Sequence, residues 1–473
     1  PTSISGTSMA SPNVAGIAAL VASRQPSWTP AMLKAAVMNT AVHDVWTGPN
    51  KTGDRYAPAR VGAGRVDANR ATSASLLVDS PGGNGRVSAV FGVVSAPEGS
   101  EVLTRTRKVR VRNTGNKATT ATLRYEPVNS TPGITYSVSP STLSVGAGKS
   151  ATAEVTMRVD GARLRRTMDP TMAEDMLGIG LRRDYVPDSS GRLVVERGDG
   201  GAPYRLPVYG TAEPVSTTKG SVNEAGDGID LTGQGVAQGF GGRAYRSLAS
   251  VLELGASDGR TAACTYPDSL PGCTTAADRA SDLRYIGAGQ GDGLLYFGLA
   301  SYDDWTQVGG ALTPYVDYDT DGDGAADYQT YVDNYGNGDL YVAVTVDLAA
   351  GPDADPVDIQ LLNFTDGDTD TNKFDTNVAL LPVDPTLLDL PTDGAAPVDY
   401  TVGVYNGASG TVLEEVSTKQ PYQVGEPRIS TENALYDDQG GTTIPIEGSG
   451  GAQALLVHLN GAPGARAEVL DVP

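Results

Sequence analysis

The stretch SISGTSMASPNVAGIAALVASR, residues 3–24, decides how the chain begins its fold. Its second half predicts an amphipathic helix, because apolar side chains that recur at i, i+3, i+4 and i+7 share one helical face. The residues at that spacing are Val14, Ile17, Ala18 and Val21. Pro12 fits near the start of such a helix, where the first backbone N–H groups have no partner. We therefore expect a helix with one buried face, beginning close to Ser8.

Ser8 has two interpretations at the beginning of this helix. A serine there can simply cap the helix by accepting hydrogen bonds from the first backbone N–H groups. It can also act as a nucleophile, because the N–H groups and the positive end of the helix dipole can stabilise an oxyanion. A serine hydroxyl needs a neighbouring base for that reaction. Position alone favours the capping interpretation.

Three segments in order change this assessment. The first is SGTSMASP around Ser8, the second is SWTPAMLKAAVMNTA at 27–41, and the third is VGAGRVDANRA at 61–71. The second segment predicts a helix with Thr29 as its N-cap and Pro30 in its first turn. Together they resemble the subtilisin-like serine proteases, the subtilases. The resemblance implies that residues 1–75 are the C-terminal end of an α/β catalytic domain, with Ser8 as the catalytic nucleophile. It departs from the family at Asn13, where subtilases usually have a histidine that is not the catalytic one.

The sequence contains two histidines, His43 and His458. His43 follows the second expected helix, and His458 lies in an apolar segment that predicts a strand. We expect structural roles for both. The family's order of Asp, His and Ser along the chain implies that the catalytic Asp and His and an oxyanion-hole Asn lie before Pro1. We therefore expect this chain alone to be inactive.

Composition limits the remaining possibilities. A chain of 473 residues is expected to form about three domains. A net charge of −21 argues against binding nucleic acid, and no apolar run is long enough to span a membrane. The resemblance implies a secreted protein, and in an oxidising compartment the spacing of Cys264 and Cys273 predicts a disulfide. The alternative is two free thiols in a surface loop.

Beyond the first 75 residues, alternating apolar and polar residues predict β-structure. In KVRVRN, Val109 and Val111 are expected to point inward. We expect a mainly β, multi-domain chain, with a fibronectin type III-like β-sandwich at 76–214 that contains an insertion at about 161–200. A β-rich domain is expected at 217–390 and a smaller sandwich-like domain at 395–473.

One loop has the spacing of a calcium site. DYDTDGDGAADY places Asp319, Asp321, Asp323 and Asp327 at positions 1, 3, 5 and 9 of a calcium-binding loop. Gly324 stands at position 6, but Thr330 replaces the usual bidentate Glu at position 12, so Asp317 or Asp333 would have to compensate. The sequence predicts Ca²⁺ here, and the alternative is a solvated acidic turn. Residues 366–375 repeat the pattern more weakly, with no glycine at the turn position, and predict only a solvated loop.

The sequence as a whole predicts a secreted serine endopeptidase that acts on proteins or peptides. Its β-domains are expected to hold substrate, cell surface or matrix polymers. The alternative function is a non-catalytic, calcium-stabilised array of β-domains that binds such partners.

Overall fold

The computed structural model describes residues 6–43, 45–82, 85–239, 244–264, 275, 278–351, 354–388, 390, 396–448 and 451–473. The chain forms two compact units. Unit 1 consists of Pro1–Ala96, Ser100–Ala173 and Val186–Glu213, and unit 2 of Pro97–Gly99, Glu174–Tyr185 and Pro214–Pro473. The fold is mainly β, with helices in the N-terminal segment, as the sequence predicted.

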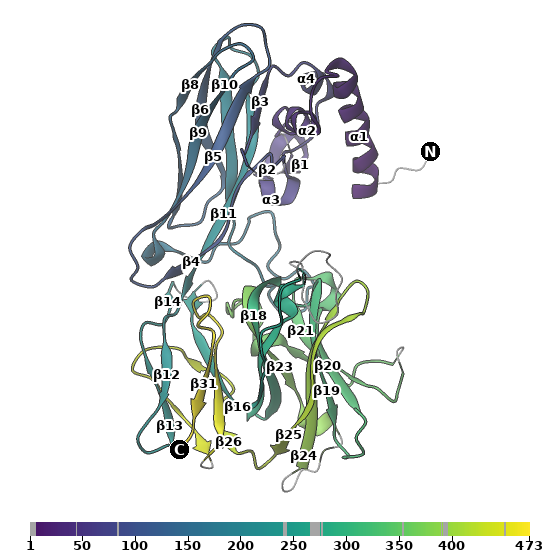
Figure 1. Ribbon diagram of the computed structural model, residues 1–473, viewed down its shortest axis with the longest axis vertical. Helices are drawn as coiled ribbons and strands as arrows, with labels where there is room; N and C mark the ends of the chain where they lie inside the picture. The colour runs from purple at the N-terminus through teal and green to yellow at the C-terminus, as the bar shows by residue number, and fades with distance from the viewer. Residues whose placement is uncertain are drawn as a thin grey trace. The chain divides into compact units, whose positions relative to one another are not determined.

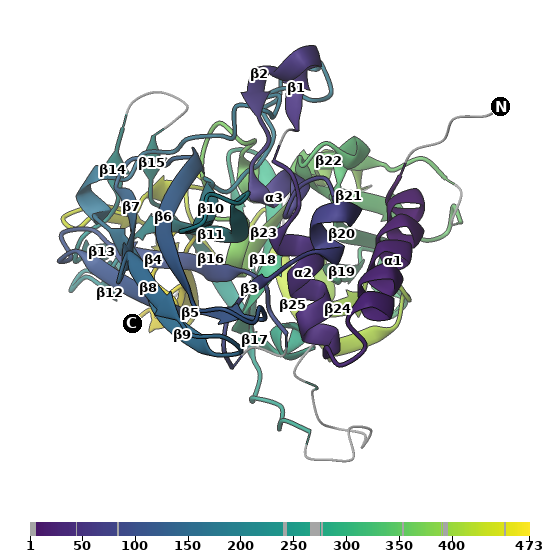
Figure 2. The same ribbon diagram turned by 90° about the horizontal axis from the view of Figure 1, so that it is seen from above.

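The helices of unit 1 are α1 (Thr7–Arg24), α2 (Pro30–Asn39), α3 (Pro58–Val61) and α4 (Ala68–Thr72). The predicted start of α2 is confirmed: Pro30 is its first residue, and Thr29 Oγ1 accepts a hydrogen bond from Met32 N. Asp67 caps α4 in the same way through Arg70 N. Figures 1 and 2 show the four helices gathered on one side of the unit 1 strands, with the hairpin β1 (Trp46–Gly48) and β2 (Thr52–Arg55) near α3.

Two sheets make up the rest of unit 1. The first has the strand order β4-β11-β10-β6-β8 and the second β3-β5-β9-β7. The strands are β3 (Leu76–Asp79), β4 (Ala89–Pro97), β5 (Leu103–Asn113), β6 (Thr119–Asn129), β7 (Ile134–Ser139), β8 (Thr142–Val145), β9 (Ser150–Val159), β10 (Ser189–Arg197) and β11 (Tyr204–Val215).

The two sheets pack face to face. Tyr136 on β7 contacts the rings of Phe91 on β4 and Tyr125 on β6, and its hydroxyl donates to the carbonyl of Ser189 on β10. The predicted inward side chains of β5, Val109 and Val111, are both buried. Alternation therefore identified the sandwich correctly, and the specific likeness to fibronectin type III domains stays a prediction.

The predicted insertion at about 161–200 is only partly right. Its last part is β10, which pairs with both β6 and β11 and is a central strand of the five-stranded sheet. Every residue from Ser189 to Val195 is buried. A strand covered on both faces lacks the alternation by which an exposed strand is recognised, so the segment did not look like part of a sandwich.

The middle part of the insertion, Glu174–Tyr185, contributes to unit 2. Asp184 and Lys373 form an ion pair there, with side chains that are 5% and 2% exposed. The ammonium lies 3.0 and 3.1 Å from the two carboxylate oxygens of Asp184, and Tyr341 N also donates to Asp184. Lys373 donates in addition to the carbonyl of Thr365. This buried pair fixes Glu174–Tyr185 within unit 2.

Unit 2 is built from several sheets, of which the largest two have the orders β23-β18-β17-β16-β30-β31 and β22-β21-β20-β19-β24-β25. Their strands are β16 (Leu248–Ser257), β17 (Leu283–Gly291), β18 (Leu294–Gln307), β19 (Leu312–Asp319), β20 (Tyr328–Asn334), β21 (Tyr341–Asp347), β22 (Asp358–Leu361), β23 (Phe374–Val383), β24 (Ala396–Asn406), β25 (Val412–Val424), β30 (Gln453–His458) and β31 (Ala467–Asp471). Smaller pairings use β12 (Lys219–Val222), β13 (Gly228–Thr232), β14 (Ala237–Gln238), β15 (Tyr245–Arg246), β26 (Ile429–Ser430), β27 (Tyr436–Asp437), β28 (Thr443–Pro445) and β29 (Glu447–Gly448).

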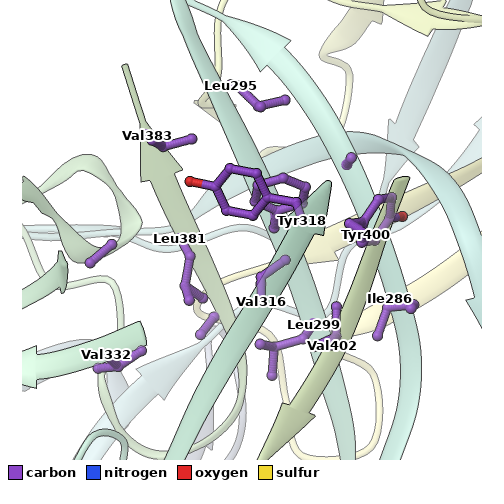
Figure 3. Close-up of a cluster of buried hydrophobic side chains, with 14 of the residues drawn as sticks. Ile286, Leu295, Leu299, Val316, Tyr318, Val332, Leu381, Val383, Tyr400 and Val402 are labelled. Carbon is purple, nitrogen blue, oxygen red and sulfur yellow. The ribbon is translucent and has the colours of Figure 1, made fainter. Parts of the chain in front are cut away.

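The main core of unit 2 lies between these two sheets (Figure 3). Phe297 on β18 is fully buried, and its ring centroid lies 5.3 Å from that of Tyr318 on β19 and 5.1 Å from that of Tyr400 on β24. Aliphatic side chains such as Val316 and Leu381 fill the space around these rings. Seven aromatic side chains belong to this core, namely Phe297, Trp305, Tyr318, Tyr328, Tyr341, Tyr400 and Tyr422.

The predicted boundary near residues 390–395 is wrong. β24, on one side of it, pairs with β19, on the other, from Leu312↔Asn406 to Asp319↔Asp399. Likewise β30 pairs with β16, from Ala249↔His458 to Glu253↔Ala454. Strands from both predicted domains therefore share the same sheets. The Pro- and Gly-containing segment at this boundary resembles a linker only in sequence.

Candidate functional site

Ser8 occupies the first turn of α1 and is exposed. The residue before the helix is Gly6, whose φ of 153° is open to glycine, and no side chain caps the helix. Met9 N and Ala10 N both donate to the Gly6 carbonyl. The hydroxyl of Ser8 therefore lies at the positive end of an 18-residue helix dipole, reachable from solvent.

The face of α1 that was predicted to be buried is only partly covered, with Val14 exposed and Ile17 and Ala18 half-buried. Of its four residues only Val21 is fully buried, and Val14 is 41% exposed. Neighbouring Leu20 is 56% exposed. α1 contacts α2 and α4 through its C-terminal half, and among the described residues no sheet covers its N-terminal half. The amide of Asn13 donates to the Met9 carbonyl at 2.7 Å, which is a local hydrogen bond within the helix.

His43 follows α2 in unit 1. Burial and the nearby guanidinium groups of Arg192, Arg205 and Arg55 lower its pKa to about 3. The imidazole is thus neutral at physiological pH. Among the described residues, no hydrogen bond joins it to Ser8.

His458 lies in unit 2, in a fully buried polar network. Its Nδ1 lies 2.9 Å from Asp438 Oδ1 and 3.2 Å from Thr218 Oγ1, while Ser216 Oγ donates to Asp438 Oδ2 at 2.6 Å. Although burial opposes it, the hydrogen bond from His458 lowers the pKa of Asp438. The Asp–His pair resembles half of a catalytic triad, but both side chains are 0% exposed. A substrate cannot reach them, so their role is structural.

The acidic loop brings three of its four predicted ligands together. Asp319, Asp321 and Asp327 each offer a carboxylate oxygen, and these oxygens lie within 4.8 Å of one another. Asp319 is buried, Asp321 is exposed and Asp327 is intermediate. Asp323 is outside this group, and its Oδ1 accepts a hydrogen bond from Ala325 N. Three hard oxygens at this separation are suitable ligands for Ca²⁺.

A lysine from a distant strand reaches this loop. Lys419 on β25 donates to Asp319 Oδ2 and to the Gly324 carbonyl, at 2.9 Å in both cases. This hydrogen bond, together with those from Gly322 N and Gly324 N, lowers the pKa of Asp319, although burial opposes the shift. Sequence analysis missed Lys419, because nothing in VSTKQPY indicates which loop lies beside it. The ammonium already supplies part of the positive charge that a metal would bring.

The second acidic segment, residues 366–375, is paired with an arginine side chain. Arg182, from the unit 2 part of the predicted insertion, forms an ion pair with Asp368, and its backbone N–H donates to Asp366. Within the part of the chain that the structure describes, these carboxylates do not form a group suited to a metal.

Cys264 is disulfide-bonded, as predicted, whereas Cys273 lies outside the described residues.

Comparison with known proteins places the first of these sites in a family. Residues 2–85 match the model described as the subtilase family. The segment around Ser8 is therefore similar to the subtilase family, and the match fits the C-terminal portion of a subtilase. The resemblance seen in three short sequence segments is confirmed.

The curated relatives agree with this assignment. The chain is 46% identical over 80 residues to the subtilisin-like protease SBT1.3 of Arabidopsis thaliana, which is 16% of this chain and 10% of that protein. It is 43% identical over 79 residues to the subtilisin-like protease SBT3 of Solanum lycopersicum, with the same two coverages of 16% and 10%. A longer match, to SBT2.6 of Arabidopsis thaliana, is 30% identical over 196 residues, 33% of this chain and 23% of that protein. The chain thus spans only a small part of the length of these relatives.

Solved structures add little. A FixG-related protein from Vibrio parahaemolyticus aligns with a TM-score of 0.16 and 9% identity, over 24% of this chain and 80% of that one. A score this low supports no conclusion about fold. In the described residues, none of the helices has the length and apolar character needed to cross a bilayer.

Proposed function

We propose that the intact protein is a secreted serine endopeptidase and that Ser8 is its nucleophile. The observation that carries the proposal is the exposed Ser8 at the beginning of α1, within a segment that matches the subtilase family. An exposed hydroxyl there can attack a scissile carbonyl, and its own backbone N–H can help to hold the oxyanion.

The base for this reaction comes from outside residues 1–473. His43 and His458 are the two histidines of the chain, and the surroundings of both serve structure rather than catalysis. In the intact enzyme a separate His would accept the Ser8 proton, and an Asp would orient that His. Proteins or peptides are the substrates. Without the base, Ser8 is a weak nucleophile and this chain alone is inactive.

An activity-based probe tests this proposal. A fluorophosphonate should label the intact protein at Ser8 and leave residues 1–473 unlabelled. Ser8→Ala should abolish labelling of the intact protein, whereas Ser11→Ala, an exposed serine on the same helix, should leave it unchanged. Labelling of residues 1–473 at the rate of the intact protein would show that the base lies within this chain. An unlabelled intact protein would support the alternative, a non-catalytic array of β-domains that binds substrate, cell surface or matrix polymers.

We propose in addition that the loop containing Asp319, Asp321 and Asp327 binds Ca²⁺. The support is the convergence of their three carboxylate oxygens. Position 12 has no carboxylate and Lys419 occupies part of the coordination space at Asp319, so we expect weak binding, with a Kd on the order of 10⁻⁴–10⁻³ M.

Thermal unfolding with calcium or chelator tests the loop. Millimolar Ca²⁺ should raise the melting temperature, and Asp321→Asn should remove most of that rise. Asp368→Asn, in the second acidic segment, should leave the rise unchanged. Lys419→Met should increase the apparent calcium affinity, because it removes a competing cation from Asp319. Superimposable melts of the wild type in calcium and in chelator would identify the loop as a solvated acidic turn.

A further inference from the structure

Unit 1 contains a cluster of three arginines, of which one is buried and two are partly exposed. Arg192 on β10 is 1% exposed, and neither its Nε nor its Nη1 has a hydrogen-bond partner among the described residues. The Nε atoms of Arg55 on β2 and Arg205 on β11 are also buried without a partner in that part of the chain. We call these three residues the arginine cluster. Their N–H groups are donors that need an acceptor, since buried polar groups are nearly always hydrogen-bonded.

The pairing of the strands places these side chains together. Arg192 lies opposite Glu126 on β6, and Val194, two residues further on, lies opposite Arg205 on β11. Residues directly opposite each other, and those two apart on one strand, share a face of the sheet. Arg55 reaches the same face from β2, because its Nη2 donates to Glu126 Oε1 at 2.8 Å.

The carboxylate next to the cluster is already occupied. Glu126 Oε1 accepts from Arg55, and its Oε2 accepts from Arg124 at 3.1 Å. Although burial opposes it, these hydrogen bonds lower the pKa of Glu126, which keeps it ionised. Arg124 is half exposed and also forms an ion pair with Glu196, so its charge is balanced without the cluster. Arg192 lies opposite Glu126 on the neighbouring strand, yet among the described residues it donates no hydrogen bond to this carboxylate.

The positive charge of the cluster persists in spite of burial. Burial lowers the pKa of Arg192 to about 10, which leaves the guanidinium charged at neutral pH. Arg55 and Arg205 repel it, and Glu126 partly offsets that repulsion. His43 adjoins the cluster in its neutral form, because burial and these same arginines lower its pKa to about 3. The cluster therefore carries an excess of positive charge in a chain whose net charge is −21.

We propose that the arginine cluster binds a small inorganic anion between β10, β11 and β2. Guanidinium groups are the side chains best suited to anions, because their N–H donors remain charged and directional. The anion must be small, of the size of chloride or phosphate, because Arg192 is almost fully enclosed. Since β2 belongs to the subtilase-like segment and β10 and β11 to the sandwich, the anion would hold these two parts of unit 1 together.

Thermal unfolding of residues 1–473 in a panel of sodium salts tests the proposal. Chloride, phosphate and gluconate are compared at constant ionic strength, with gluconate as the anion that is too bulky to enter. A ligand that binds only the folded state stabilises in proportion to the logarithm of its concentration above Kd. Each tenfold increase in the concentration of the anion that binds should therefore raise the melting temperature of unit 1 by about 3–5 °C. The panel distinguishes a halide site from an oxyanion site.

Two variants show where the anion acts. Arg192→Met should remove the anion-dependent rise, whereas Arg105→Met, an exposed arginine on β5, should retain it. The proposal would be overturned in favour of general salt screening if gluconate raised the melting temperature as much as the other anions, or if the Arg192→Met variant kept the anion-dependent increase. Identical wild-type melts in all three salts would also overturn it.

Diffraction from wild-type crystals grown in bromide does not depend on any variant folding. An anomalous peak beside Arg192 supports a halide site. If the melts point to an oxyanion instead, phosphate density at the same place supports the proposal. Electron density for water alone in both crystals would show that hydration satisfies the cluster.

Discussion

Replacing Lys373 by methionine should destabilise unit 2 strongly. The substitution keeps the length of the side chain but leaves Asp184 as a buried carboxylate, 5% exposed, without its ammonium partner. Removing one partner of a buried ion pair costs about 3–5 kcal/mol. The Tyr341 N–H, which also donates to Asp184, recovers only a small part of this loss. For a unit of this size the melting temperature should fall by about 6–15 °C.

Tryptophan fluorescence can follow unit 2 by itself. Trp305 is 1% exposed in the unit 2 core, and the other two tryptophans, Trp28 and Trp46, belong to unit 1. In a Trp28→Phe, Trp46→Phe background the emission therefore reports unfolding around Trp305. Urea titration then gives the free energy of unfolding for each variant.

Two comparisons make the test specific. Arg260→Met breaks an ion pair with Asp303 whose side chains are 54% and 37% exposed, and it should cost no more than about 1 kcal/mol. Adding Asp184→Asn to Lys373→Met should recover part of the loss, because the neutral amide needs no counter-charge. A loss for Lys373→Met as small as that for Arg260→Met would refute the reasoning.

Three further results are expected. His43 has a pKa of about 3 in the folded protein against 6.5 when unperturbed, so the unfolded state binds the proton at a higher pH than the folded state does. The free energy of unfolding of unit 1 should therefore fall as the pH is lowered from about 7. Urea titrations at several pH values should show this slope, and His43→Gln should flatten it. Phe297→Ala should cost unit 2 about 3–5 kcal/mol by urea denaturation, because it empties a fully buried ring site, and a cost under about 1 kcal/mol would contradict the packing described. Cys264 should resist iodoacetamide in denatured, unreduced protein and react after reduction, and mass spectrometry decides between a bond and a free thiol.

The predictions from sequence succeeded where local pattern determines structure. Alternation placed Val109 and Val111 inside, and Thr29 with Pro30 marked the start of α2. They failed where pairing partners are distant. Nothing near residue 390 indicates that β24 returns to β19, and a strand buried on both faces, such as β10, has no alternation to detect.

The candidate sites show the same division. Ser8 was identified because its signature is contiguous, and Asp319 with Asp321 and Asp327 because the loop spacing is regular. Lys419 could not be foreseen, since its approach to Asp319 depends on how β25 passes the loop. Nothing in GRLVVER distinguishes Arg192 from an exposed arginine, because only the folded sheet shows that its side chain is enclosed.

The position of β30 has a consequence for how the protein is made. β16 (Leu248–Ser257) needs β30 (Gln453–His458) as its neighbour, and the two are synthesised almost 200 residues apart. During translation, β16 leaves the ribosome before β30 exists, so the edge that β30 will cover stays unpaired until β30 has been synthesised. Unpaired edges are sites of misassociation, and contacts so distant in sequence form slowly. Unit 2 therefore cannot complete its fold until β30 emerges, whereas the strands of unit 1 are all available once residue 215 has been made.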